Sequence, residues 1–197
     1  MAANIPPPQV ARALDVEQYQ NAARAAGLQR MAFLAGPYIE IDNPPKKAKK
    51  NLASTLRFKL YHHLSGDGWL VTLGEYSKLI DTTGGVLKKH NNSFVAEQSH
   101  AMSKEVDAVV MLPSSPGSFL ELGAFAIKYE ICQKMIIIIH NEYENHINYL
   151  NTGPLKMAKT HGASINFIDY SDTEMCWSAV KDFCSDRFER KILNGML

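Results

Sequence analysis

The chain has 197 residues, of which 46% are hydrophobic and 21% are charged. This balance is that of a globular protein of about one domain, and it excludes the disordered and fibrous classes. The 21 Lys and Arg residues nearly match the 20 Asp and Glu residues, so a net charge of +1 gives no general attraction to nucleic acid or anionic membranes. The longest strongly apolar run, residues 135–139, is too short to span a bilayer, and we expect no membrane association.

The cysteines and the first residues of the chain bear on its compartment. Cys132, Cys176 and Cys184 lack CxxC spacing, which argues against a disulfide framework and against a zinc site. Residues 1–8, MAANIPPP, lack the basic start and apolar block of a secretory signal. We therefore expect a cytoplasmic protein with no metal ion and no cofactor.

Residues 1–30 differ in composition from the rest. The proline triplet predicts an extended start, and the Ala- and Gln-rich residues 16–28 predict a short helix closed by Gly27. We expect residues 1–30 to be an N-terminal extension and residues 31–197 to form one α/β domain.

Apolar runs and segments of helical spacing alternate about five times after residue 30. The apolar runs predict buried strands at residues 31–35, 69–73, 107–112, 135–139 and 164–168. The helices are expected at residues 52–64, 94–106, 119–129, 155–160 and 172–193. Continuous apolar strands separated by helices predict a doubly wound, Rossmann-like parallel sheet of five strands with helices on both faces.

Ligands of such sheets bind just beyond the carboxyl ends of the strands. That rule indicates the turn Gly36-Pro37-Tyr38, the loop after residue 73, and residues 113–118.

The segment after the third strand, PSSPGSFLELGAF, carries the most chemical information. Backbone N–H groups at a helix start, with serine hydroxyls and Gly117 beside them, suit a phosphate or another anionic group. Glu121 is expected on the first turn of that helix. It is either a capping-box partner of Ser118, because Ser-x-x-Glu is itself such a pattern, or a carboxylate that attacks or stabilises the anomeric carbon of a nucleotide sugar.

Two motifs carry a family resemblance. The ELGA run after DAVVML and a hydroxyl-rich turn, together with FLAGPY near the start, resembles the nucleoside 2-deoxyribosyltransferase-like superfamily. Within it, the SPGSF-x-ELGAF run and the segment NYLNTGPL are similar to the deoxyribosyltransferase-like effectors of bacterial retron anti-phage systems. The resemblance covers roughly residues 31–168.

The resemblance implies a site. Glu121 matches the family nucleophile, which forms a glycosyl ester with C1′, Tyr38 lies where the family places a group near the nucleophile, and Ser115 matches a substrate-contacting position. The family usually has an Asp eight residues before Asp107. Here that position is Ser99, and Glu97 is the candidate for the missing carboxylate. The expected catalytic residues are thus Glu121, Tyr38 and Glu97, and the expected substrate-binding residues are Gly36, Pro37, Ser99, Ser114, Ser115, Gly117, Ser118 and Asn151.

Three functions follow as hypotheses. The first is an N-glycosidase or (deoxy)ribosyltransferase that cleaves the base–sugar bond of a nucleoside, a nucleotide or NAD as an anti-phage effector. The second is a nucleotide-sensing module without turnover, which Ser99 favours. The third is a subunit that assembles with a regulatory protein or RNA, for which the basic residues Lys46, Lys47, Lys49 and Lys50 are the indication. The resemblance also implies a homodimer or higher homo-oligomer, with Tyr149 and Asn151 near the partner's site.

Other residues favour structural interpretations. We expect His100 to be a surface residue, and an acid near the leaving base is its alternative. We expect His62 and His63 to complement the end of their helix, and Cys132 and Trp69 to lie in the core. Stacking of a base by Trp69 and Tyr76 is the alternative.

Overall fold

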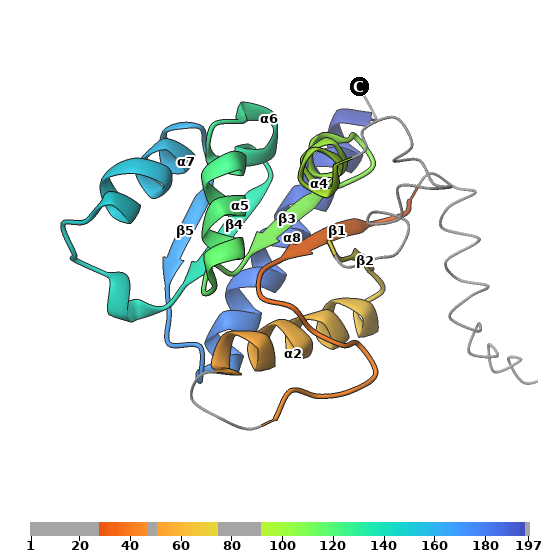
Figure 1. Cartoon of the computed structure of the whole chain (residues 1–197). Helices are drawn as coiled ribbons and strands as arrows, with labels where there is room; N and C mark the ends of the chain where they lie inside the picture. Colours follow the sequence, from red (N-terminus) through yellow and green to blue (C-terminus); the bar gives the residue numbers. More distant parts are fainter. Residues whose placement is uncertain (1–27, 47–50, 75–91, 196–197) are drawn as a thin grey trace, which may run out of the picture.

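The protein is a three-layer α/β structure in the computed structural model, which describes residues 28–46, 51–74 and 92–195 (Figure 1). Its five strands are all parallel and have the order β2-β1-β3-β4-β5. The expected doubly wound fold is therefore confirmed. The strands are β1 (Met31–Ala35), β2 (Leu70–Thr72), β3 (Ala108–Met111), β4 (Met135–Ile139) and β5 (Ser164–Phe167).

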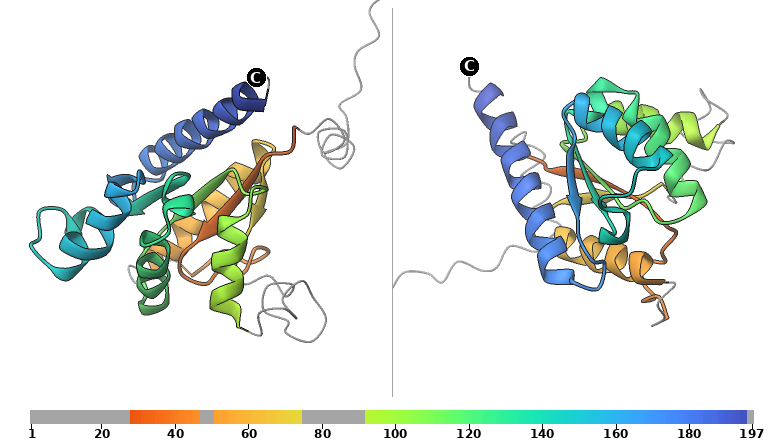
Figure 2. Two further views of the ribbon diagram at one scale, coloured as in Figure 1. Left: turned by 90° about the horizontal axis from the view of Figure 1, so that it is seen from above. Right: turned by 90° about the vertical axis from the view of Figure 1, so that its left-hand side faces the viewer.

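Helices cover both faces of the sheet. Helices α2 and α8 lie on one face, and α4, α5, α6 and α7 lie on the other (Figure 2). Their bounds are α2 (Leu52–Gly66), α4 (Ser93–Met102), α5 (Pro116–Ala126), α6 (Tyr129–Cys132), α7 (Lys156–Thr160) and α8 (Thr173–Gly195). A 3₁₀ turn, η3 (Asn141–Tyr143), and a π-helical turn, η4 (Asn151–Leu155), connect β4 to α7.

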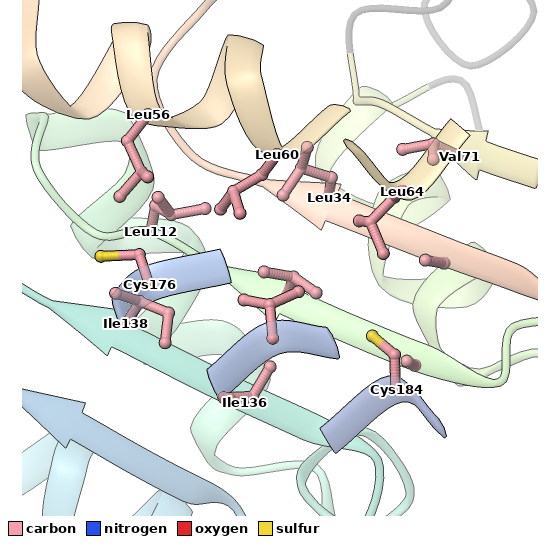
Figure 3. Close-up of a cluster of buried hydrophobic side chains, with 14 of the residues drawn as sticks. Leu34, Leu56, Leu60, Leu64, Val71, Leu112, Ile136, Ile138, Cys176 and Cys184 are labelled. Carbon is pink, nitrogen blue, oxygen red and sulfur yellow. The ribbon is translucent and has the colours of Figure 1, made fainter. Parts of the chain in front are cut away.

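Side-chain alternation along the strands builds two cores. Leu34 of β1 points to α2 and α8, whereas Phe33 and Ala35 point to the other layer. On the first side, Leu56, Leu60 and Leu64 of α2 are at most 1% exposed and pack on the sheet together with α8 (Figure 3). Each fully buried leucine contributes roughly 1.5–3 kcal/mol relative to leaving it exposed, so this stripe fixes α2 against β1. Trp69 and Cys132 are in the core, as expected.

Three expected helices have different bounds. The segment predicted to continue to residue 106 leaves the helix at Ser103, whose backbone is extended, and the carbonyls of Ser103 and Val106 instead accept hydrogen bonds from Lys134 Nζ. The predicted helix 119–129 is two helices, because Lys128 is extended between α5 and α6. The helix expected at residues 155–160 is preceded by the turn η4.

Asp107 joins three parts of the chain at the amino edge of the sheet. Its Oδ2 accepts a hydrogen bond from the Met31 N–H at 2.9 Å, and its Oδ1 lies 2.7 Å from Lys191 Nζ of α8. Lys191 also donates to the Gln29 carbonyl at 3.4 Å. The start of β1 and the end of α8 are thereby tied to the central strand.

The expected helix at residues 16–28 and the expected N-terminal extension at residues 1–30 lie outside the described residues, apart from residues 28–30. None of the helices in the described part of the chain has the length and apolar character needed to cross a membrane.

Three buried thiols predict how stability depends on pH. Burial raises the pKa of Cys132 to about 11 and of Cys176 and Cys184 to about 12, from an ordinary value of 9.0. Above about pH 9 the unfolded chain loses these protons first, so the free energy of unfolding falls as pH rises. Burial also lowers the pKa of Lys134 from 10.5 to about 8, which acts in the opposite direction between those two values.

Comparison of the wild type with Cys184→Ala isolates one thiol from the opposing lysine. We expect the melting temperature of Cys184→Ala to fall less steeply between about pH 9 and pH 10.5 than that of the wild type. Thermal unfolding followed by circular dichroism measures both curves. Parallel curves would contradict the assignment.

Candidate functional site

The sheet order reverses between β1 and β3, which is where doubly wound sheets bind ligands. The two strand ends are in close contact, because the Leu112 N–H donates to the Ala35 carbonyl at 3.0 Å. Gly36 has φ +149°, and a Cβ there would lie only 3.0 Å from the Leu112 carbonyl oxygen. Glycine at position 36 thus lets the first turn pass directly over the end of β3.

The guanidinium of Arg57 in α2 holds the turn that follows β1. The side chain is 1% exposed, and its Nη2 and Nη1 donate to the carbonyls of Leu34 at 2.6 Å and Pro37 at 2.8 Å. A guanidinium can hold both carbonyls because its donors are arranged in a rigid plane. Sequence analysis missed this residue. The one available signal was an arginine directly after Leu56 on an otherwise leucine-lined helix face.

The turn between β3 and α5 is held by a reciprocal cap. Ser115 is the N-cap of α5, and its Oγ accepts from the Ser118 N–H at 3.3 Å. Ser118 Oγ accepts from the Ser114 and Ser115 N–H groups at 2.9 and 2.8 Å. The capping-box interpretation of Glu121 with Ser118 is therefore wrong, because Ser118 is the third helical residue and pairs back with Ser115.

The cap decides which groups of this turn face solvent. Ser118 is 3% exposed and the hydroxyls of Ser115 and Ser118 contact each other at 3.0 Å. Ser114 and Gly117 are exposed, and a Cβ on Gly117 would meet nothing within 4 Å. Ser114 and Gly117 are thus the groups of the turn best placed to meet a ligand, whereas Ser115 and Ser118 shape it.

Glu121 lies on the second turn of α5, not on the first as expected. It is half-buried and follows Gly117 by one helical turn. The same side of α5 carries Ala124, whose carbonyl accepts from Gln98 Nε2 of α4 at 3.2 Å. Helix α5, which carries Glu121, thus contacts α4 and begins after β3, next to the point where the sheet order reverses.

Glu97 and Ser99 differ in their surroundings on α4. A Cβ on Gly74, just after β2, would lie 2.7 Å from Glu97 Oε1, so the Glu97 carboxylate rests against the end of that strand. Ser99 is exposed. Glu97 therefore provides the carboxylate of α4, and this carboxylate lies near the strand ends.

His100 is not the surface residue that the sequence suggested. Its Nε2 lies 2.8 Å from Thr72 Oγ1, and its ring packs edge-on against Phe33 with centroids 5.4 Å apart. Burial lowers the pKa of His100, with a smaller contribution from Lys134. The ring of Phe33 also packs against that of Phe125 of α5, with centroids 6.2 Å apart. Phe33 therefore lies between α4 and α5.

Of the remaining expected residues, three follow β1 and one lies in the connection between β4 and α7. Gly36, Pro37 and Tyr38 follow β1 at the carboxyl edge, where Tyr38 is 67% exposed. Asn151 is elsewhere, at the start of η4, and its Nδ2 donates to the carbonyls of Tyr143 and His146 at 2.7 and 2.6 Å.

Of the other residues that the sequence singled out, the structure describes the two histidines of α2 but not most of the basic loop. His63 lies in the last turn of α2, as expected, and stacks on Trp177, while His62 Nε2 lies 3.2 Å from the Ile41 carbonyl. Lys47, Lys49, Lys50 and Tyr76 lie outside the described residues. Within residues 28–46, 51–74 and 92–195, no group of three or more His, Cys, Asp or Glu side chains is placed to hold a metal ion.

The sequence of the chain is similar to those of known proteins. Residues 78–194 match the family model described as "STM3845 retron effector protein". The chain is 29% identical over 94 residues to the "Retron Ec86 putative ribosyltransferase/DNA-binding protein" and 34% identical over 74 residues to the "Retron Ec73 putative ribosyltransferase/DNA-binding protein", both of Escherichia coli. These matches cover 47% and 37% of this chain but only 31% and 23% of the relatives. Because the family model covers more than half of its residues, the chain belongs to the STM3845 retron effector family.

Proposed function

We propose that this retron effector acts against phage by cleaving the N-glycosidic bond of a nucleoside, a nucleotide or NAD, as an N-glycosidase or (deoxy)ribosyltransferase. The observation that carries the proposal is the half-buried Glu121 on α5, one helical turn after the exposed Gly117, on the helix that begins next to the point where the sheet order reverses. The ribosyltransferase names of both E. coli relatives agree with it.

The proposed reaction has two steps. A Glu121 oxygen attacks C1′, the C1′–N bond breaks with its electron pair going to the base, and the base takes up a proton. A water molecule or a second acceptor then attacks C1′ of the glycosyl ester, gives up a proton and releases the Glu121 carboxylate. Water gives hydrolysis and another base gives transfer.

Other residues have supporting roles in this proposal. Ser114 and Gly117 offer a hydroxyl and a backbone N–H to phosphate or ribose oxygens, and Tyr38 orients the carboxylate. Ser115 and Ser118 hold the shape of the turn through their cap. Gly36 and Pro37 shape the opposite wall.

Incubation of the purified protein with nucleosides, deoxynucleoside monophosphates and NAD tests the proposal. We expect chromatography to show a free base from at least one of them. The second candidate, a sensing module without turnover, is favoured by the exposed Ser99 at the position of the usual Asp. It predicts calorimetric binding of a nucleotide without any base release.

Glu97 is proposed as the second carboxylate of the site. Because Glu97 rests against the end of β2 and Ser99 is exposed, we expect Glu97→Ala to lower the rate of base release by about a hundredfold and Ser99→Ala to change it less than about threefold. The two single variants are compared in the same assay. A harmless Glu97→Ala with an inactive Ser99→Ala would reverse the assignment.

The outer face of α5 supports the proposal of a homodimer. Leu120 and Ile127 are 73% and 62% exposed, and a Cβ on Gly123 between them would meet nothing within 4 Å. A groove of about 400 Å³ beside them is lined by Tyr149, Gly153 and Met157, among others. An exposed apolar helix face beside a groove is normally covered, and the proposed dimer would bring Tyr149 of this groove, with Asn151 nearby in the chain, toward a partner's site.

Ile127→Asp tests the proposed interface. We expect light scattering at micromolar concentration to give a dimer or larger assembly for the wild type and a monomer for this variant, because a charge would be buried without a partner. Leu193→Asp on α8, which alters an equally exposed side chain on the other face, is the matched control and should leave the assembly unchanged. A fully active wild-type monomer would exclude the dimer.

A regulatory protein or RNA partner and a cytoplasmic location also remain proposals. Four lysines of a basic loop suggested such a partner. The structure describes one of them, Lys46, which is exposed.

A further inference from the structure

Strand β5 is at the edge of the sheet. It pairs with β4, and among the described residues no strand pairs with its other side. Edge strands expose backbone N–H and C=O groups that another chain can pair with, and proteins usually protect them with lysine, proline or a bulge on the strand. The sequence of β5, Ser-Ile-Asn-Phe, contains neither lysine nor proline.

The register of β5 shows which groups point outward. The Ile168 N–H donates to the Ile139 carbonyl at 3.0 Å, and Phe167 is the register partner of Ile139. Because backbone groups alternate in direction along a strand, those of Ile165 and Phe167 point away from β4. Two successive outward positions give one repeat of a pairing ladder.

A groove runs beside this edge. It has a volume of about 390 Å³ and is bounded by Ile165 and Phe167 on β5, by the loop at residues 145–147, and by Lys156 and Lys159 of α7. Ile147 at its rim is 97% exposed. None of the described residues that line it is acidic. The groove thus combines apolar side chains, two exposed lysines and an open strand edge.

We propose that this groove binds an extended segment of another protein as a sixth strand beside β5, with apolar and acidic residues at every second position, on the face that meets α7. Its backbone pairs with Ile165 and Phe167. Because side chains two residues apart share a face, its apolar side chain contacts Ile147 and Phe167, and the carboxylates that follow on the same face meet Lys156 and Lys159. The site is separate from Glu121 and does not depend on the proposed reaction.

Charge separates this occupant from two others. A second copy joined by its own β5 around a two-fold axis would place the α7 helices on the same face, and their lysines would repel. A nucleic acid strand would use the lysines but would leave the open backbone groups of Ile165 and Phe167 unpaired. An acidic extended peptide satisfies both features.

The test uses the full chain and a capped hexapeptide, Thr-Val-Thr-Glu-Thr-Glu, labelled for fluorescence anisotropy, which presents valine and two glutamates on one face. We expect binding that weakens roughly tenfold in Lys156→Glu/Lys159→Glu, since both attractions become repulsions. The control Lys104→Glu/Lys181→Glu, which changes two exposed lysines outside the groove, should bind as the wild type does. Amide hydrogen exchange should slow at least about fivefold at Ile165 and Phe167 when the peptide is bound.

Four outcomes would overturn the proposal. They are absence of peptide binding, equal weakening by both double variants, unchanged exchange at Ile165 and Phe167, and tighter binding of the same hexapeptide with lysine in place of glutamate or of a single-stranded oligonucleotide. A dimer that is lost when β5 is altered would assign the edge to a second copy instead.

Discussion

Replacement of Glu121 by glutamine is expected to lower the rate of base release at least about a thousandfold while leaving the fold intact. The change removes the negative charge and the nucleophilic oxygen that C1′ requires, and it alters the side-chain shape very little. Because Glu121 lies outside the serine cap, the start of α5 does not depend on it. Initial rates of base release and thermal unfolding are measured on the same preparations.

Glu130→Gln is the matched control for this variant. Glu130 is an exposed carboxylate on α6, at the opposite edge of the sheet, and its removal should leave the rate within a factor of about two. Full activity of Glu121→Gln would exclude Glu121 as the nucleophile. Loss of both activity and cooperative unfolding would instead assign the carboxylate a structural role.

The second large effect is expected at Arg57. Arg57→Met leaves the buried carbonyls of Leu34 and Pro37 without these donors, and we expect a loss of about 3 kcal/mol in the free energy of unfolding. A loss of this size lowers the melting temperature by roughly 6–12 °C in a domain of this length. Chemical denaturation and thermal unfolding both measure it.

Two further variants define what the guanidinium does. Arg57→Lys keeps a charge but cannot hold both carbonyls in one plane, so it should recover less than half of the lost stability. Lys59→Met, an exposed change on the same helix, should stay within about 0.5 kcal/mol of the wild type. An Arg57→Met variant as stable as the wild type would show that burying the charge costs as much as its hydrogen bonds contribute.

The strands were predictable because their apolar pattern has a single physical explanation. A run such as Met135–Ile139, apolar at every position, fits a strand covered on both faces, and it is buried throughout. The parallel, doubly wound arrangement then followed from the alternation with helices. The helix ends were less predictable, because tertiary contacts such as Lys134 Nζ with the Ser103 carbonyl decide where α4 stops.

The site was predictable only in part. Strand-end rules located the turns after β1 and β3, but two serines competed for the cap of α5. Ser115 takes it, since Pro116 fits the first helical position and fixes the start there. In the sequence, little distinguishes His100 and Arg57 from exposed polar residues of a helix. Their burial follows from which helix face meets the sheet, which no local pattern specifies.

The ties made by Asp107 have a consequence for how larger proteins can be built from this domain. The Met31 N–H and Lys191 both contact its carboxylate, so the start of β1 and the last turns of α8 lie at the same edge of the sheet, opposite the edge where α5 begins. A module joined directly before Met31 or directly after Lys191 would therefore begin on the other side of the described residues from the proposed reaction. Such a module would reach the proposed substrate entrance only through a linker that crosses the sheet.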